Sequence, residues 1–393
     1  MGKKIVIFSF LANFVKQSEE LIPIFIMMKR LLTIALAAIC AGCAEQQPAE
    51  APSLELFQDG IHHWYLVHER GSVERYADDD YVAIAENILR YQNEDGGWPK
   101  NMDWQAKIDA DSVKATLSKR EGRSTFDNRN IYPQVEYLAA VYRLTGDKRY
   151  RDASARGVEY ILSTQYPNGS WIGWEDEAIA FNDSIIDGIL RLWQKVLKGD
   201  PNFDWLSRKT LRRIEQSWEK GLRIILDTQY VQNGVKSVWA QQHDQQTLQP
   251  VKARTYELPS LTANESAGIV LFLMSIEEPT QEVIDAVKAA VAWFEKTKIL
   301  GKKIITIPMP EGNPEDRSIK ADRRLVDDPE AEPLWARFYE LEDNTIFLCN
   351  RDGIKVYSLD KVWPERRLGY SWYGTWGNEV LQAYPAWLER ISK

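Results

Sequence analysis

The chain has 393 residues, enough for two or three domains or for one large toroidal domain. Its 57 acidic residues outnumber its 49 basic residues, and the net charge of −8 argues against a protein that coats nucleic acid. The aromatic residues are 15 Trp, 17 Tyr and 12 Phe. This excess of Trp and Tyr over Phe favours a cleft lined by amphipathic rings. We expect its ligand to be a carbohydrate.

Cysteine and histidine are scarce, which excludes several kinds of site. The three cysteines and four histidines show no spacing that is typical of a structural zinc site. The sequence also lacks the G-x-S-x-G elbow, the phosphate-binding loop and the G-x-G-x-x-G motif. Esterase, NTPase and dinucleotide-binding functions therefore lack their usual signals.

Residues 1–43 are predicted to be an upstream segment followed by an export signal. Lys29 and Arg30 precede a short apolar run, and small residues lead up to Cys43. The Ala-Gly-Cys ending resembles a bacterial lipoprotein signal, in which Cys43 is lipidated and becomes the first mature residue. We therefore expect an exported protein, either a cell-envelope lipoprotein or a secreted one, whose only membrane contact is that lipid.

Residues 44–55 are polar and are predicted to form a flexible tether to a domain that spans residues 56–393. Beyond residue 80, apolar residues recur at three-to-four spacing, as amphipathic helices require. Examples of this spacing are Ile131, Val135, Leu138 and Tyr142; Ile185, Ile189, Leu192 and Val196; and Val283, Val287, Val291 and Phe294.

Three helix ends have similar sequences: NILRYQNEDGGW, YILSTQYPNGSW and IILDTQYVQNGV, which align Gln92, Gln165 and Gln229. A helical hairpin that repeats at this scale predicts an all-α fold, an α/α toroid built as an incomplete ring of hairpins. Residues 300–375 lack helical periodicity, and we expect a long irregular C-terminal loop region there with little β structure. Its only plausible strands are 306–308 and 345–348.

Two loops between predicted helices are rich in Asp and Asn. Asp127 and Asn128 precede one helix, and Asn182 and Asp183 precede the corresponding helix of the next hairpin. Each pair has a simple interpretation as a helix cap. Because the loops occupy equivalent points of a ring, they can also converge at its centre, where carboxylate and amide oxygens suit a hard cation such as calcium.

Arginines accompany aromatic residues in the loops of the second half of the chain. Arg254, Arg337 and Arg351 are examples. Taken singly, each is consistent with a surface or ion-paired residue. Several such arginines beside Trp and Tyr favour recognition of carboxylates along an extended ligand.

A series of motifs from Gly96 onward resembles the family 10 polysaccharide lyases, which are pectate lyases. The series covers most of the chain, and its most specific part runs from WARFYEL through RDG to GYSWYG. The full series is GGWPKN, STFDN, FND, VWAQQHDQQTLQPVKARTYELPSL followed by ES, DPEAEPLWARFYEL, NRDGI and ERRLGYSWYG.

The resemblance implies roles for individual residues. Asp127, Asn128 and Asp183 match residues that surround the catalytic Ca²⁺ and the substrate carboxylate. Arg254 matches the arginine that acts as catalytic base. The resemblance further implies that arginines bind uronate carboxylates at flanking subsites, and the matching positions are Arg337 and Arg351. The sequence departs from the family pattern at Arg129 and Asn130, where small residues are usual.

The implied function is a calcium-dependent pectate lyase that cleaves 4-linked polygalacturonate by anti β-elimination and releases 4,5-unsaturated oligogalacturonides. Its partner is an acidic polysaccharide, not a nucleic acid, and we expect a monomer. Two alternatives stay open. One is a glycoside hydrolase on the same kind of ring that uses two carboxylates, for which Glu257 or Asp244 are candidates. The other is a non-catalytic glycan-binding lipoprotein.

Overall fold

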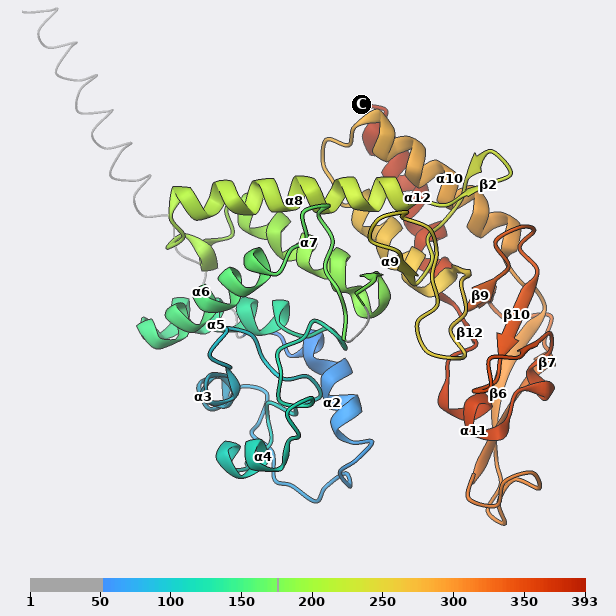
Figure 1. Cartoon of the computed structure of the whole chain (residues 1–393), viewed down its shortest axis with the longest axis horizontal. Coiled ribbons are helices and arrows are strands. Elements are labelled where there is room, and N and C mark those ends of the chain that lie inside the picture. The colour runs from blue at the N-terminus through green and yellow to red at the C-terminus, as the bar shows by residue number, and fades with distance from the viewer. Residues whose placement is uncertain (1–51, 175–176) are drawn as a thin grey trace, which may run out of the picture. The chain divides into compact units, whose positions relative to one another are not determined.

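The computed structural model describes residues 52–174 and 177–393 (Figure 1). The predicted export signal, Cys43 and most of the predicted tether lie outside the described residues, so the boundaries proposed for these segments stay a prediction. Within the described part of the chain, no helix is both long and apolar enough to cross a membrane.

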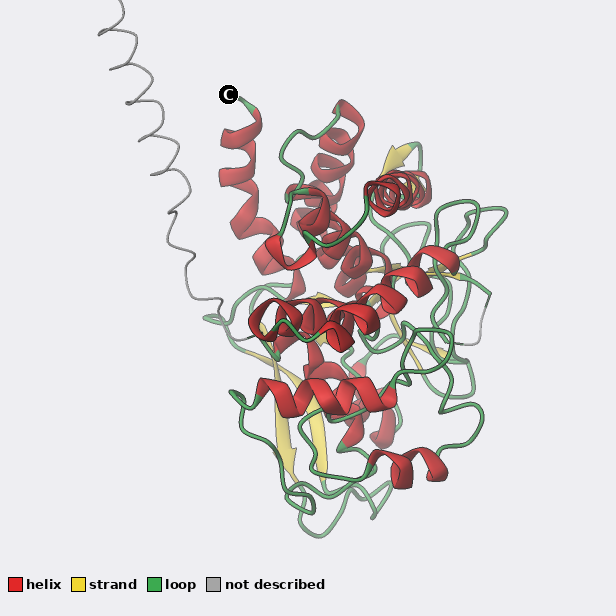
Figure 2. Ribbon diagram, turned by 90° about the vertical axis from the view of Figure 1, so that its left-hand side faces the viewer, coloured by secondary structure: helices red, strands yellow, loops and turns green. Residues whose placement is uncertain are grey.

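Helical hairpins dominate the described residues and confirm the predicted all-α class. α5 packs on α6, α7 on α8 and α9 on α10, while α12 packs on both α9 and α10. Figure 2 shows these helices lying beside one another. The α-helices are α2 (Gln58–Trp64), α3 (Tyr81–Tyr91), α4 (Ala110–Thr116), α5 (Tyr132–Thr145), α6 (Lys148–Ser163), α7 (Ile185–Leu197), α8 (Arg208–Thr228), α9 (Ala263–Met274), α10 (Gln281–Thr297), α11 (Pro364–Gly369) and α12 (Trp376–Ile391).

The helices of a hairpin differ in how much of their surface is apolar. In α7 and α9, most residues are buried, whereas α8 buries one stripe and exposes its charged residues. A helix that is apolar on most sides needs neighbours on most sides, so α7 and α9 form the inner layer and α8 the outer layer. Side-chain caps begin two of the outer helices, Ser207 for α8 and Thr280 for α10.

The three aligned glutamines form equivalent contacts, which we call glutamine bridges. Each side-chain amide donates to a carbonyl in the turn after its own helix and to a carbonyl inside the next outer helix. Gln92 bonds Gly96 and Ala153 of α6, Gln165 bonds Gly169 and Ser217 of α8, and Gln229 bonds Ser237 and Ala286 of α10, all at 2.8–2.9 Å.

A buried tryptophan follows each glutamine bridge and donates its indole N–H back to the outer helix just completed. The pairs are Trp98 with Ile88, Trp171 with Ile161, and Trp239 with Ile225, at 2.7–2.9 Å. The sequence repeat is therefore a structural repeat. It joins consecutive outer helices and sends the chain inward after each of them.

Residues 300–375 contain more strand than the sequence predicts. The expected strands are present within β6 (Lys302–Pro308) and β10 (Ile346–Cys349). β7 (Ala321–Asp327) pairs antiparallel with β6 and was not expected, because four charged residues in ADRRLVD hide any apolar alternation. β10 lies between β9 (Phe338–Tyr339) and β11 (Lys355–Val356), and β5 (Leu261–Thr262) completes this sheet. Figure 1 shows β6, β7, β9 and β10 in the same part of the molecule as α11.

Gln165→Ala is expected to lower the free energy of unfolding by about 2 kcal/mol or more, because two carbonyls lose their bridging donor. The urea midpoint measures this loss. Gln281→Ala is the matched control. Gln281 is exposed at the start of α10 and bonds only the Asp285 side chain, so its loss is expected to cost no more than about 0.5 kcal/mol. Equal costs for the two variants would contradict a structural role for the bridge.

Candidate active site

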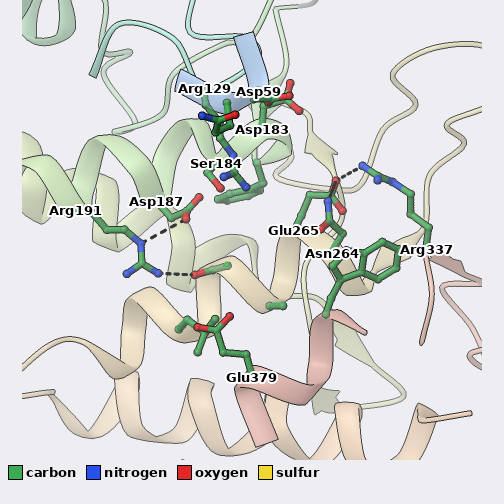
Figure 3. Close-up of a pocket in the computed structure, with 16 residues that line it drawn as sticks. Asp59, Arg129, Asp183, Ser184, Asp187, Arg191, Asn264, Glu265, Arg337 and Glu379 are labelled. Carbon is green, nitrogen blue, oxygen red and sulfur yellow. Dashed lines mark hydrogen bonds and ion pairs between the residues drawn. The ribbon is translucent and has the colours of Figure 1, made fainter. Parts of the chain in front are cut away.

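A polar cavity of about 660 Å³ lies where the inner helices begin (Figure 3). Arg129 comes from the loop before α5, Asp183 from the loop before α7, Glu265 from the first turn of α9 and Glu379 from the first turn of α12. Asp59 of α2 completes this wall. The repeat places these loops at one end of the hairpins, and helix N-termini there favour anionic groups.

The two Asx-rich loops meet at this end of the hairpins. The Asn182 amide donates to Asp183 Oδ2 at 2.9 Å and to Asp127 Oδ1 at 3.4 Å. The backbone N–H of Asn128 donates to Asp183 Oδ2 at 3.3 Å. The structure thus brings together the three residues that the sequence singled out as cation ligands.

Neither loop acts as a simple helix cap. The residues at the N-cap positions are Ile131 for α5 and Ser184 for α7, and neither makes a side-chain cap bond. Both loops instead contain consecutive non-glycine residues with positive φ: Asn128 and Arg129 at 57° and 54°, and Asp183 and Ser184 at 55° and 53°. Such backbone is rare and clusters at functional sites. The capping interpretation is therefore wrong for these loops.

The two carboxylates are placed so that both cannot ionise at low cost. Burial, together with the charge of Asp127, raises the pKa of Asp183 to about 7. Lys100 pairs with Asp127, and its ammonium lies 4.0 Å from the centre of the Trp174 ring. A cation beside Asp127 and Asp183 would therefore lower the cost of ionising both carboxylates.

A calcium-type cation fits this donor set. Besides the two carboxylates, Asn182 Oδ1 is buried and has no hydrogen-bond partner. Hard oxygen atoms of this kind are the ligands that Ca²⁺ takes, with water or substrate completing the shell. Across residues 52–174 and 177–393, no three His, Cys, Asp or Glu side chains cluster closely enough to hold a metal by themselves. A cation bound here would need amide oxygens as well as the two carboxylates.

Arg337 is the buried cation of the cavity. It lies between β8 (Trp335–Ala336) and β9 and donates to Glu265 Oε1 at 2.6 Å, as Figure 3 shows. Burial lowers the pKa of Arg337, but the charge of Glu265 outweighs this effect and raises it. Arg337 Nε and Glu265 Oε2 are both buried without partners. This ion pair therefore retains one donor and one acceptor for a ligand.

Arg254 belongs to a second group of cations, which surrounds Tyr256. Its guanidinium contacts Glu257 at 2.6 Å and lies 4.9 Å from the centre of the Tyr256 ring. Arg351 and Arg366 lie 5.6 and 5.0 Å from the same ring centre. The third sequence-predicted arginine, Arg351, is thus near Arg254, where it pairs with Glu365 at 2.7 Å.

Tyr370 connects the two groups of cations. Arg337 lies 4.7 Å and Arg254 5.7 Å from the centre of its ring. The Tyr370 hydroxyl donates to Glu257 Oε1 at 2.8 Å. Arginines therefore follow one another from the carboxylate pair toward the C-terminal sheet, an arrangement that suits a chain of anionic sugars.

The two carboxylates considered for a hydrolase are poor proton donors. Burial raises the pKa of Glu257, but its hydrogen bonds with Arg254 outweigh this effect and lower it to about 2. Asp244 accepts hydrogen bonds from Thr247 and Gln246, which lower its pKa. A general acid needs a raised pKa. Neither residue therefore suits the role of acid in hydrolysis.

The sequence interpretation missed several residues of the site, among them Lys100, Trp174, Arg366 and Tyr370. Lys100 lies in GGWPKN, and Arg366 and Tyr370 lie in ERRLGY. These motifs were recognised, but the spacing within each did not indicate which side chain faces the site. Trp174 had no local signal.

Comparisons with known proteins identify the family of the chain. A model of the pectic acid lyase family matches residues 92–381. A family 10 polysaccharide lyase from Cellvibrio cellulosa has a TM-score of 0.64 and 32% identity, covering 77% of this chain and 91% of its own. A mutant of a family 10 polysaccharide lyase from the same organism, in complex with trigalacturonic acid, has a TM-score of 0.65 and 29% identity, covering 86% and 99%. No curated protein matches the chain.

The fold and the site thus define a polysaccharide lyase built on helical hairpins. More specifically, the chain belongs to the pectic acid lyase family and is a pectate lyase related to the family 10 polysaccharide lyases. The resemblance seen in its motifs is confirmed.

Asp183→Asn is expected to raise the melting temperature more at pH 8 than at pH 4, measured in a chelator. The folded pKa of Asp183, about 7, lies above the unfolded value of 3.8. Ionisation therefore destabilises the fold progressively between these values and fully above pH 7, whereas Asn carries no such penalty. Asp244→Asn should act oppositely and lower the melting temperature at pH 8, because the pKa of Asp244 is lowered. If Asp183→Asn changes the melting temperature equally at pH 4 and pH 8, the pKa of Asp183 is not raised in the folded protein.

Proposed function

We propose that this pectate lyase is calcium-dependent and cleaves 4-linked polygalacturonate by anti β-elimination, with Arg254 as the base. The observation that carries the proposal is the Asp127 and Asp183 carboxylate pair, followed by arginines that share Tyr370 and Tyr256. The trigalacturonic acid bound by the Cellvibrio cellulosa mutant supports the choice of substrate.

Asp127, Asn128 and Asp183 would hold the cation, and Asn182 Oδ1 adds a fourth oxygen that the sequence interpretation did not assign to it. Bound Ca²⁺ supplies positive charge beside the C6 carboxylate of the uronate, which makes the C5 proton more acidic. In the elimination, the base takes the C5 proton, the electron pair forms the C4–C5 double bond, and the bond from C4 to the glycosidic oxygen breaks.

Arg337 and Arg351 bind carboxylates of the sugar chain. Arg337 Nε is buried without a partner, so a uronate oxygen at this point satisfies a donor that the fold leaves open. Arg351 is held toward Tyr256 by Glu365. Because these arginines come from the β8 to β9 connection and the end of β10, they bind successive sugars and fix the chain relative to Asp127 and Asp183.

Arg254 removes the proton in its neutral form. Burial lowers the pKa of Arg254, but the hydrogen bonds that Arg254 donates to Glu257 outweigh burial and raise it, with further contributions from Tyr256 and Tyr370. The neutral fraction is therefore small at neutral pH and increases about tenfold per pH unit, so activity increases with pH. Glu257 orients the Arg254 guanidinium, but because it also raises the pKa of Arg254 it lowers the neutral fraction.

Polygalacturonate is a large polymer, so the proposed activity requires export. This agrees with the signal predicted in residues 1–43 and with a lipid at Cys43 as the only membrane attachment. We also propose that the enzyme acts as a monomer.

The test of this function is incubation with polygalacturonate while following the near-UV absorbance of 4,5-unsaturated uronate. With Ca²⁺ the absorbance should increase, and a chelator should stop it reversibly. Arg254→Ala is expected to lower turnover by about 10²–10⁴-fold because a general base is lost, while polygalacturonate stays bound through Arg337 and Arg351. Arg324→Ala, which removes an exposed charge from β7, is the control. Saturated products or a chelator-resistant rate would overturn the proposal.

Glu257→Gln is expected to shift the rising limb of the pH–rate profile to lower pH. Without the carboxylate, the pKa of Arg254 falls and its neutral form is more populated at a given pH. Asp244→Asn removes another carboxylate of the same loop region and should leave the limb in place. Circular dichroism checks that the Glu257→Gln variant is folded. If its pH–rate profile then rises at the same pH as that of the wild type, Arg254 is not the titrating base.

A further inference from the structure

Arg129 is a cavity-lining arginine that the proposed mechanism does not use. It is exposed, and Figure 3 shows its side chain reaching from the loop before α5 into the cavity that also contains Asp183 and Arg337. No hydrogen bond or ion pair holds its guanidinium within the described part of the chain.

The acidic neighbours of Arg129 have nearer partners. Asp59 lies 3.3 Å from His63, and Asp187 lies 3.7 Å from Arg191. The charge of Arg129 reaches both carboxylates only through space, as one of several influences on their pKa values. Arg129 therefore keeps its guanidinium donors available, unlike Arg191, which bonds the Gly268 carbonyl, and Arg337, which bonds Glu265.

The backbone on both sides of Arg129 is fixed. Asn128 donates its N–H to Asp183, and the buried side chain of Asn130 donates to the carbonyls of Trp98 and Thr125 at 2.8 Å. Arg129 itself has φ of 54°, which an arginine rarely adopts. The loop thus fixes the point from which the side chain leaves the backbone, while leaving its donors unbonded. A loop that is already ordered adds no entropic cost of its own to binding.

We propose that Arg129 binds the carboxylate of a uronate that lies on the α2 and α5 side of the Asp183 carboxylate, and that it makes the enzyme select an unesterified sugar at this position. This inference rests on the proposed function. A planar guanidinium with free donors matches a carboxylate through two hydrogen bonds. A methyl ester at the same sugar carries no charge and offers a weaker acceptor. Arg129 therefore distinguishes an ionised carboxylate from a methyl ester on a sugar that does not itself react.

The test compares KM for polygalacturonate and for partly methyl-esterified pectin. Arg129→Gly removes the cation and suits the positive φ, so the loop is preserved. Its KM for polygalacturonate is expected to increase about tenfold, the value of one charge-assisted hydrogen bond, with a much smaller increase for the esterified substrate. The enzyme would then discriminate less between the two. Arg129→Lys keeps the charge and should restore part of the discrimination.

Arg143→Ala is the matched control. It removes the same charge near the other end of α5, about 20 Å away, where Arg143 bonds the Pro201 carbonyl. Unchanged KM values and discrimination in Arg129→Gly would overturn the inference while wild-type lyase activity stands. An equal rise in KM for both substrates would also overturn it, because a carboxylate contact cannot act alike on acid and ester. If the wild type releases no unsaturated product, the proposed function has failed instead.

Discussion

The arrangement of this enzyme depends on the glutamine bridge. A single side-chain amide closes the turn after an outer helix and bonds the next outer helix, so it determines both where one hairpin ends and how far away the next one lies. The tryptophan that follows returns to the same outer helix and directs the chain inward. Because this happens three times with the same geometry, the loops that follow reach one end of the hairpins. The polar cavity forms where these loops come together.

That end of the hairpins contains more charge than a protein interior usually tolerates. Asp127 and Asp183 oppose each other, and Glu257 and Glu265 are buried. Three of these carboxylates are paired with a cation: Asp127 with Lys100, Glu257 with Arg254 and Glu265 with Arg337. Within the described part of the chain, Asp183 has only the N–H donors of Asn182 and Asn128. A buried charge that loses its partner is costly, so these pairs hold the site in one geometry. The pair with Glu257 also raises the pKa of Arg254, so the proposed role of Arg254 as base predicts an alkaline preference.

Sequence reasoning succeeded where a local pattern had one physical meaning. The helical stripes predicted the hairpins, and the aligned Gln92, Gln165 and Gln229 predicted the repeat because equivalent residues make equivalent contacts. It failed for β7, whose charged residues conceal a strand. Helix capping was also a reasonable interpretation of the two Asx-rich loops. Only the structure shows the positive φ values of both loops and the Asn182 amide that bonds both Asp127 and Asp183.

The sequence by itself determined the all-α class and, through its motifs, the lyase family. The resemblance to that family also predicted six site residues: Asp127, Asn128, Asp183, Arg254, Arg337 and Arg351. These follow from periodicity and motifs, which are properties of neighbouring residues. Only the tertiary structure decided how the charges are paired. It placed Glu265 against Arg337, joined Arg366 to Arg351 around Tyr256, and left Arg129 without a partner among the described residues. Electrostatic energies depend on distance through space, and residues far apart in the chain set those distances.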